Sequence, residues 1–155
     1  MIRLLVLDVD GTMTDGGVYY DGAGLVLARA AGLQVMICTG RASEAVRRRA
    51  EELKVTYLYQ GVADKAAFLR GFLAEQGLRR EEVAYCGDDL NDLAAMALCG
   101  FVTCPADATP AVARRADYRC PRRGGEGAVR DAVEEILRRD GRLADAARKA
   151  FDAEL

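Results

Sequence analysis

The sequence predicts an α/β protein built on a Rossmann-like parallel sheet with helices on both faces. Short, almost continuous apolar runs recur along the chain, helical patterns lie between them, and several runs end at polar side chains. Strands that are apolar on both sides are typical of parallel sheets buried between two helical layers. Functional groups of such sheets gather beyond the carboxyl ends of the strands, so the polar residues after each run are the candidate site residues.

Each expected element follows from a local pattern. The apolar runs predict strands at 4–7, 33–38, 55–58, 83–86 and 101–104. Helices are expected at 42–53, 65–76 and 91–98, the second because Phe68, Leu69, Phe72 and Leu73 recur at helical spacing. Near the carboxyl terminus, Val129, Val133, Ile136 and Leu137 indicate one more amphipathic helix.

Length and composition limit the class of protein. The chain has 155 residues, 51% of them hydrophobic and 30% charged, which suits one compact domain. We expect that domain at 1–140 and a charged, helical tail at 141–155. The net charge of −2 argues against nucleic-acid binding. No apolar run approaches the ~20 residues of a membrane span, and no leader precedes the first strand, so we expect a cytoplasmic protein without membrane contact.

Two residue types restrict the chemistry. Histidine is absent, which removes Ser-His-Asp and Cys-His catalysis and histidine-bound zinc. The five cysteines form no C-x-x-C pair, and most lie in or beside apolar runs. Buried free thiols in a reducing compartment are the simplest interpretation, and a reactive thiolate is not favoured. Acid–base catalysis therefore falls mainly to carboxylates.

Carboxylates follow two of the predicted strands. Asp8 and Asp10 come after the first strand, Asp88 and Asp89 after the fourth, and Asp92 one helical turn beyond Asp88. Carboxylates gathered at neighbouring strand ends repel one another unless a cation compensates them. Oxygen ligands of this kind favour Mg²⁺. The alternative is that these residues only cap helices, a common role of aspartate.

Further polar groups follow the second and third strands. Thr39, Gly40 and Arg41 come directly after the second strand, where a hydroxyl and free backbone N–H groups can bind an anion. Lys65 opens the helix after the third strand, where a cation opposes the helix dipole unless it serves an anion. Thr39 could instead be a simple helix cap.

Together these motifs resemble the phosphatases of the haloacid dehalogenase superfamily. The matching segments are DVDGT at 8–12, TGR at 39–41, Lys65 and GDDLND at 87–92. The similarity is closest to the capless members that act on sugar-acid phosphates, and it covers about residues 2–140. It implies a Mg²⁺-dependent phosphatase without a cap domain. The implied substrate is a phosphorylated 2-keto-3-deoxy sugar acid, first of all 3-deoxy-D-manno-octulosonate 8-phosphate, in lipopolysaccharide precursor synthesis.

The resemblance also implies roles for individual residues. Asp8 would be the nucleophile that forms an aspartyl-phosphate, and Asp10 the general acid and then the general base. Mg²⁺ would bind the Asp8 carboxylate, the Asp10 backbone carbonyl and the Asp88 carboxylate. Asp89 and Asp92 would support these ligands from behind.

The substrate would be held by the remaining motif residues. The resemblance implies that Thr39, Gly40 and Lys65 bind the phosphoryl oxygens, and Arg41 is the candidate to bind the substrate carboxylate. In the resembled family four copies assemble, and a glycine-rich segment reaches a neighbouring active site. A homotetramer is therefore expected, in which Arg122, Arg123 and Arg130 either add positive charge over that site or are simply solvated.

One segment departs from the family pattern. The family has a β-hairpin before the helix that follows the first motif, whereas here residues 19–25 run the two flanking landmarks together. Val18–Tyr20 could form one strand without its return strand. Either the hairpin is deleted, which leaves the tetramer and the substrate rim in doubt, or a flexible segment is missing from the sequence.

Other functions remain open from the sequence. A phosphatase of a nine-carbon, sialic-acid-type 9-phosphate fits the same motifs. A non-catalytic oligomerisation domain is a second alternative, although the intact motifs count against it.

Overall fold

The computed structural model describes residues 1–10, 12–13 and 17–155, with the side chains of 17–20 excepted. Gly11 of the DVDGT motif and residues 14–16 lie outside the described residues. Within the described ranges, one parallel sheet has six strands in the order β3-β2-β1-β4-β5-β6. The strands are β1 (Leu4–Leu7), β2 (Gln34–Cys38), β3 (Tyr57–Tyr59), β4 (Val83–Cys86), β5 (Phe101–Cys104) and β6 (Tyr118–Arg119).

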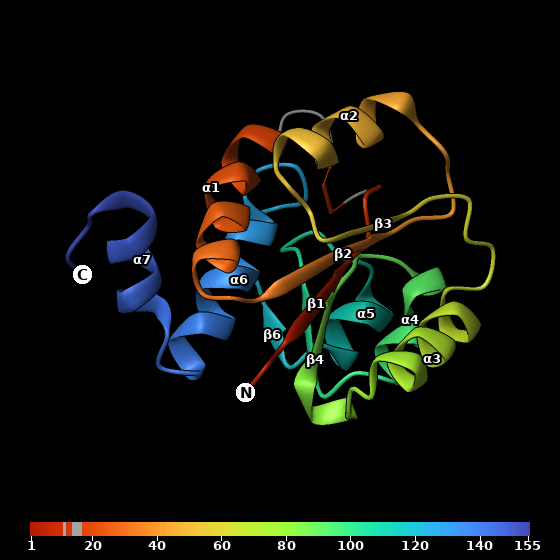
Figure 1. The fold of residues 1–155 in the computed structure, drawn as a ribbon. Helices are drawn as coiled ribbons and strands as arrows, with labels where there is room; N and C mark the ends of the chain where they lie inside the picture. The colour runs from red at the N-terminus through yellow and green to blue at the C-terminus, as the bar shows by residue number, and fades with distance from the viewer. Residues whose placement is uncertain (11, 14–16) are drawn as a thin grey trace.

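Helices cover both faces of this sheet (Figure 1). They are α1 (Gly17–Ala30), α2 (Glu44–Glu52), α3 (Lys65–Gln76), α4 (Leu93–Met96), α5 (Pro110–Arg115), α6 (Ala128–Arg139) and α7 (Leu143–Phe151). Two short 3₁₀ turns, η1 (Arg80–Glu82) and η2 (Leu90–Asp92), flank β4. The prediction of a parallel sheet between two helical layers is confirmed.

The core consists of two apolar clusters, one on each face of the sheet. Successive side chains of β1 alternate between them: Leu5 and Leu7 pack with α1, α2 and α6, whereas Leu4 and Val6 pack with α3, α4 and α5. Strand β1 is central and apolar on both sides. A shift of its register by one residue would move each side chain to the opposite cluster, where it would meet different neighbours. The carboxyl end of β1 is thereby held in the middle of the sheet.

Most predicted elements agree with the structure to within a few residues. Strands β1, β4 and β5 and helix α3 have the predicted bounds, while β3 begins two residues later than expected. The short elements α5 and β6 were not predicted, because six and two residues give too little periodicity to recognise.

The expectation of a strand at Val18–Tyr20 is wrong. These residues lie in the first turns of α1. Without a return strand, an extended segment has no partner for its backbone N–H and C=O groups, whereas a helix satisfies them internally.

The carboxyl-terminal residues form helix α7 beside α1. Helix α7 packs against α1 and buries Ala146 and Ala147. The Arg142 guanidinium donates to the carbonyl oxygens of Ile2, which precedes β1, and of Ala31, which directly follows α1. Among the described residues, no helix is long and apolar enough to cross a membrane.

Candidate active site

Four polar side chains meet at the carboxyl end of the sheet. Asp8 follows β1, Asp88 and Asp92 follow β4, and Lys65 begins α3. The Lys65 ammonium donates to Asp8 Oδ1 at 2.7 Å and to Asp92 Oδ1 at 3.0 Å, and it is almost fully buried. Residues far apart in the chain are thus brought to one point because β1 and β4 are neighbours in the sheet.

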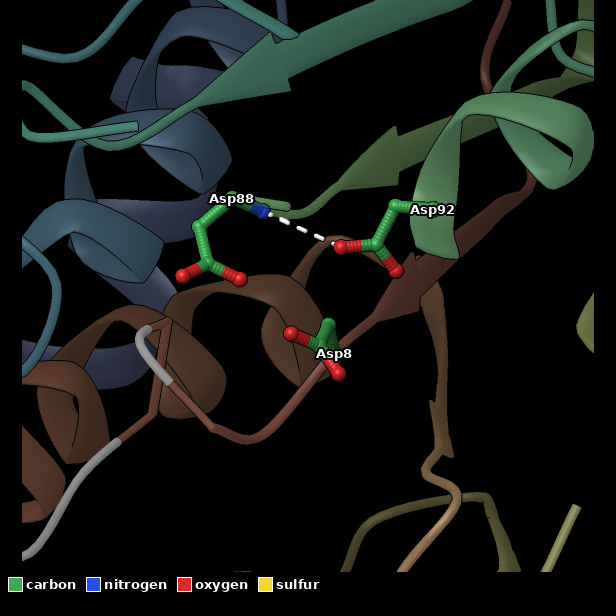
Figure 2. A group of neighbouring side chains, drawn as sticks. All are labelled: Asp8, Asp88 and Asp92. Carbon is green, nitrogen blue, oxygen red and sulfur yellow. Dashed lines mark hydrogen bonds between the residues drawn. The ribbon is translucent and has the colours of Figure 1, made fainter. Parts of the chain in front are cut away.

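Three carboxylates form a compact group around this lysine. Each of Asp8, Asp88 and Asp92 offers one oxygen, and the three oxygens lie within 4.8 Å of one another. Figure 2 shows them pointing toward a common centre, with the Asp88 backbone N–H donating to Asp92 Oδ2 at 3.1 Å. A single cation could contact this group.

Asp92 is already satisfied by protein donors. Its Oδ1 accepts from Lys65 and from the Tyr85 hydroxyl at 2.6 Å, and its Oδ2 accepts from the backbone N–H groups of Asp88 and Asp89. A Cβ on Gly87 would stand 2.5 Å from Asp92 Oδ2, so only glycine permits this approach. Asp92 therefore holds the loop that carries Asp88.

Asp88 is not satisfied in the same way. Its buried Oδ1 has no hydrogen-bond partner. Burial, a hydrogen bond with Asp8 and the nearby carboxylates raise its pKa to about 7. An orphaned buried oxygen in an acidic group is what a bound cation would satisfy, so the residues present fit a divalent metal with oxygen ligands.

The pKa values of the other two partners follow from the same crowding. Burial raises the pKa of the Asp8 carboxyl, the charge of Asp92 raises it further, and Lys65 opposes both. Burial by itself lowers the pKa of the Lys65 ammonium, but Asp8 and Asp92 more than offset it, so the pKa is raised. Lys65 stays charged, and one ammonium faces three carboxyl groups.

The segment after β2 forms the opposite wall of the site. Thr39 is buried, and its hydroxyl accepts from the Arg41 backbone N–H at 3.4 Å. The Arg41 guanidinium lies 3.4 Å from Asp10 Oδ2, and both side chains are mostly exposed. Asp10 is thus on the solvent side of the site, whereas Asp8 is buried beneath it.

Two cavities meet at these residues. One, of about 560 Å³, is lined by Asp8, Lys65 and Asp88 together with Thr39 and Gly40. The second, of about 460 Å³, extends from Asp10, Thr39 and Arg41 along the apolar side of α2. The shared residues make the second cavity continuous with the first.

The other candidate residues are placed as follows. Asp89 is exposed and caps η2, where its side chain accepts from the Leu90 N–H at 2.7 Å. All five cysteines are free and buried. Burial raises the pKa of the Cys38 thiol to about 11, which agrees with an unreactive cysteine.

The basic residues near the glycine-rich segment have acidic partners within the chain. Arg122 pairs with Asp131, Arg123 with Asp107 and Arg130 with Glu134. These pairs draw the three guanidinium groups toward carboxylates of the same subunit.

Sequence reasoning missed Tyr85. Its ring is fully buried and its hydroxyl donates to Asp92, so it anchors the carboxylate from below. A tyrosine inside a buried strand needs a hydrogen-bond partner for its hydroxyl. That requirement could have indicated from the sequence that Tyr85 contacts a polar residue of the site.

The chain is similar to known enzymes over most of its length. Residues 56–131 match the haloacid dehalogenase-like hydrolase family. The chain is 38% identical over 158 residues to the 3-deoxy-D-manno-octulosonate 8-phosphate phosphatase of Escherichia coli, covering 94% of this chain and 84% of that protein.

Solved structures show the same fold. The Moraxella catarrhalis 3-deoxy-D-manno-octulosonate 8-phosphate phosphatase, in complex with a magnesium ion, a phosphate ion and a KDO molecule, has a TM-score of 0.83 at 35% identity and covers 88% of this chain and 86% of its own. The cobalt-bound Haemophilus influenzae enzyme has a TM-score of 0.85 at 31% identity, covering 98% and 94%.

The fold, the grouped carboxylates and these relatives define the class: the chain belongs to the haloacid dehalogenase superfamily and is a phosphatase. Its relatives within that superfamily include the 3-deoxy-D-manno-octulosonate 8-phosphate phosphatases. The predicted resemblance and enzyme class are confirmed.

Proposed function

We propose that the chain hydrolyses a phosphorylated 2-keto-3-deoxy sugar acid, and specifically 3-deoxy-D-manno-octulosonate 8-phosphate, in a Mg²⁺-dependent reaction. The observation that carries the proposal is the group formed by Asp8, Lys65 and Asp88 at the bottom of an open cavity. A Moraxella catarrhalis relative was solved with magnesium, phosphate and KDO together.

In the proposed reaction, Asp8 attacks the phosphorus atom in line. A carboxylate oxygen of Asp8 forms a bond to phosphorus, and the bond from phosphorus to the sugar oxygen breaks. Asp10, which lies above Asp8 on the solvent side, gives its proton to the departing sugar oxygen. The products of this step are the free sugar acid and an aspartyl-phosphate on Asp8.

The second step regenerates the enzyme. The Asp10 carboxylate takes a proton from a water molecule, whose oxygen attacks phosphorus and displaces the Asp8 carboxylate. Lys65 and the Thr39–Gly40 segment hold the phosphoryl oxygens throughout both steps. Because Lys65 is held by two carboxylates, its ammonium is fixed before substrate arrives.

Mg²⁺ would be held by the Asp8 and Asp88 carboxylates and the Asp10 backbone carbonyl, with Asp92 and Asp89 ordering the loop behind them. When bound, the ion offsets the repulsion between the anionic phosphate and the carboxylates. The orphaned Asp88 oxygen supports this assignment.

The sugar acid would extend from the phosphoryl site into the adjoining cavity of about 460 Å³. Arg41 lies at the entrance shared by both cavities and can bind a carboxylate in a bidentate manner. Its present contact with Asp10 is long and exposed, so a substrate carboxylate can compete for it. We propose Arg41 as the residue that recognises the acid group.

The proposal includes the cellular setting. We propose a homotetramer that acts in the cytoplasm in lipopolysaccharide precursor synthesis. A nine-carbon sialic-acid-type 9-phosphate is the alternative substrate, because the cavity residues recognise phosphate and carboxylate rather than sugar length. A non-catalytic assembly role is not favoured, since the chain belongs to an enzyme family.

A phosphate-release panel tests this function. Eight-carbon and nine-carbon sugar-acid phosphates, the matching neutral sugar phosphates and a simple aryl phosphate are compared with Mg²⁺ and with chelator. We expect the highest kcat/KM with the eight-carbon acid and no turnover in chelator. In Arg41→Met the acid should lose its advantage over the neutral sugar. Equal rates for acid and neutral substrates in the unaltered enzyme would contradict the substrate assignment.

Metal binding should depend on pH. Without metal, the pKa of Asp88 is raised from 3.8 to about 7, so the fold loses stability as pH rises through this range. Mg²⁺ must displace the Asp88 proton at low pH but not above pH ~7. We therefore expect the Mg²⁺-induced rise in Tm to be larger at pH ~8 than at pH ~6. The rise should vanish in Asp88→Asn, and a rise independent of pH would contradict the assignment.

A further inference from the structure

A buried carboxylate outside the active site lies between two helices. Asp21 on α1 is 0% exposed, and its Oδ1 accepts from the backbone N–H of Arg130 at 3.3 Å in the first turn of α6. The backbone of Val129 also faces this carboxyl. The first N–H groups of a helix have no partner within the helix and carry partial positive charge. Asp21 therefore caps α6 from a neighbouring helix.

The two helices meet unusually closely at this point. A Cβ on Gly24 would lie 2.7 Å from the Cα of Arg130, so any larger residue would push α1 and α6 apart. Asp21 and Gly24 are one turn apart on the same side of α1. Close contact and capping thus occur at one place, and together they determine where α6 begins.

The segment that leads into α6 connects this place to the catalytic loop. The Gly125 backbone N–H donates to the Thr12 carbonyl oxygen at 3.2 Å, and Thr12 lies two residues beyond Asp10. Arg122 fixes the same segment from the other side, since its backbone and guanidinium N–H groups donate to Asp131 of α6 at 2.6–3.0 Å. The segment thus contacts α6 through Arg122 and the catalytic loop through Gly125.

We propose that Asp21 is a positioning residue for the phosphatase reaction: it fixes the start of α6, and the 122–127 segment transmits that position to Thr12 and hence to Asp10. The proposal rests on the phosphatase activity and not on the identity of the sugar acid. The proposal gives the contact between α1 and α6 of one subunit a function in catalysis.

The charge of Asp21 opposes stability rather than providing it. Burial raises its pKa from 3.8 to about 7, and the backbone N–H groups of Arg130 and Val129 only partly counter this. The facing charges are those of Arg122 and Asp131, with Arg49 of α2 beside Gly22. The ionised carboxyl therefore lowers the stability of the fold as pH rises from 3.8 to about 7. The ionised Asp21 carboxyl lowers the stability of the fold, but in the proposal it also positions the catalytic loop. Stability is thus given up for activity.

Asp21→Asn separates positioning from a purely structural role. The amide resembles the protonated carboxyl, so at pH ~8 we expect a Tm at or above that of the unaltered protein. The amide holds the N–H groups of α6 less strongly, so kcat toward an aryl phosphate should fall about tenfold. Inhibition by inorganic phosphate should change less than about twofold, because Lys65 and Thr39 lie on other elements.

Asp140→Asn is the matched control. Asp140 also accepts a backbone N–H, that of Ile2 at 3.0 Å, but at the opposite end of α6 from the catalytic loop. Its kcat should be unchanged. If Asp21→Asn keeps the kcat of the unaltered enzyme, or if kcat falls only in proportion to the folded fraction, the proposal is wrong.

A second measurement needs no substrate and no catalytic activity. In ¹⁵N spectra of the unaltered chain, the amides of Arg130 and Gly125 should titrate with one common midpoint near pH 7. In Asp21→Asn, the Gly125 titration should disappear. A Gly125 amide that does not titrate, or that titrates equally in Asp21→Asn, overturns the coupling whether or not the enzyme is active.

Discussion

Asp8→Asn should abolish phosphate release while leaving the protein folded. The amide cannot attack phosphorus, so we expect the rate to fall by roughly 10⁴-fold or more, as for other catalytic nucleophiles. The fold should survive because the pKa of Asp8 is raised by burial and by Asp92, so the ionised carboxylate already costs stability. Lys65 keeps its second partner, Asp92, at 3.0 Å.

Phosphate release, Tm and intact mass after incubation with substrate measure this result. The unaltered enzyme, quenched during turnover, should carry one phosphoryl group that Asp8→Asn lacks. Asp117→Asn is the control for the same chemical change, since Asp117 accepts the Val102 N–H of β5 at 2.8 Å and pairs with Arg115, and it contacts none of the candidate site residues. Substantial turnover by folded Asp8→Asn would refute the assignment of the nucleophile.

Lys65→Met should have the second-largest effect, on stability as well as activity. The Lys65, Asp8 and Asp92 side chains are 5%, 7% and 0% exposed, so methionine would leave buried carboxylates without a counter-charge. Removing one partner of a buried ion pair costs about 3–5 kcal/mol of unfolding free energy. Activity should fall at least about 100-fold, because the charge facing the phosphoryl oxygens is lost.

Urea denaturation with and without Mg²⁺ tests this expectation. Mg²⁺ should stabilise Lys65→Met more than the unaltered protein, since the ion then supplies the only cation among the three carboxylates. Lys149→Met is the control: Lys149 pairs with Asp145 on the exposed side of α7, and exposed pairs contribute less than about 1 kcal/mol. Equal free energies of unfolding for Lys65→Met and Lys149→Met would contradict this expectation. They would mean that the buried carboxyl groups become neutral when Lys65 is removed.

The approach of Asp8 and Asp88 could be predicted because both residues follow buried strands of one parallel sheet. In a parallel sheet the carboxyl ends share one edge, so residues that directly follow buried runs must approach one another. The structure placed them together as expected. Their catalytic roles remain proposals that the variants above test.

The contacts that the sequence did not reveal depend on packing rather than on spacing. Tyr85 reads as one more apolar strand residue until its hydroxyl is seen beneath Asp92. In the sequence, Asp21 is only part of the segment that departs from the family pattern, and the approach of α1 to α6 is what shows that it is buried. The Val18–Tyr20 strand was wrong for a related reason: strand formation requires a pairing partner, and local β propensity does not provide one.

The reliance of the sheet on α6 affects how the protein can be synthesised. The cluster formed by β1, α1 and α2 is closed by Val129, Val133, Ile136 and Leu137, residues of α6 that are synthesised after every strand of the sheet. The opposite cluster, closed by α3, α4 and α5, is complete before α6 is made. A nascent chain therefore carries one half-covered apolar surface until α6 has been made, and any product that ends before α6 exposes an apolar face that favours aggregation.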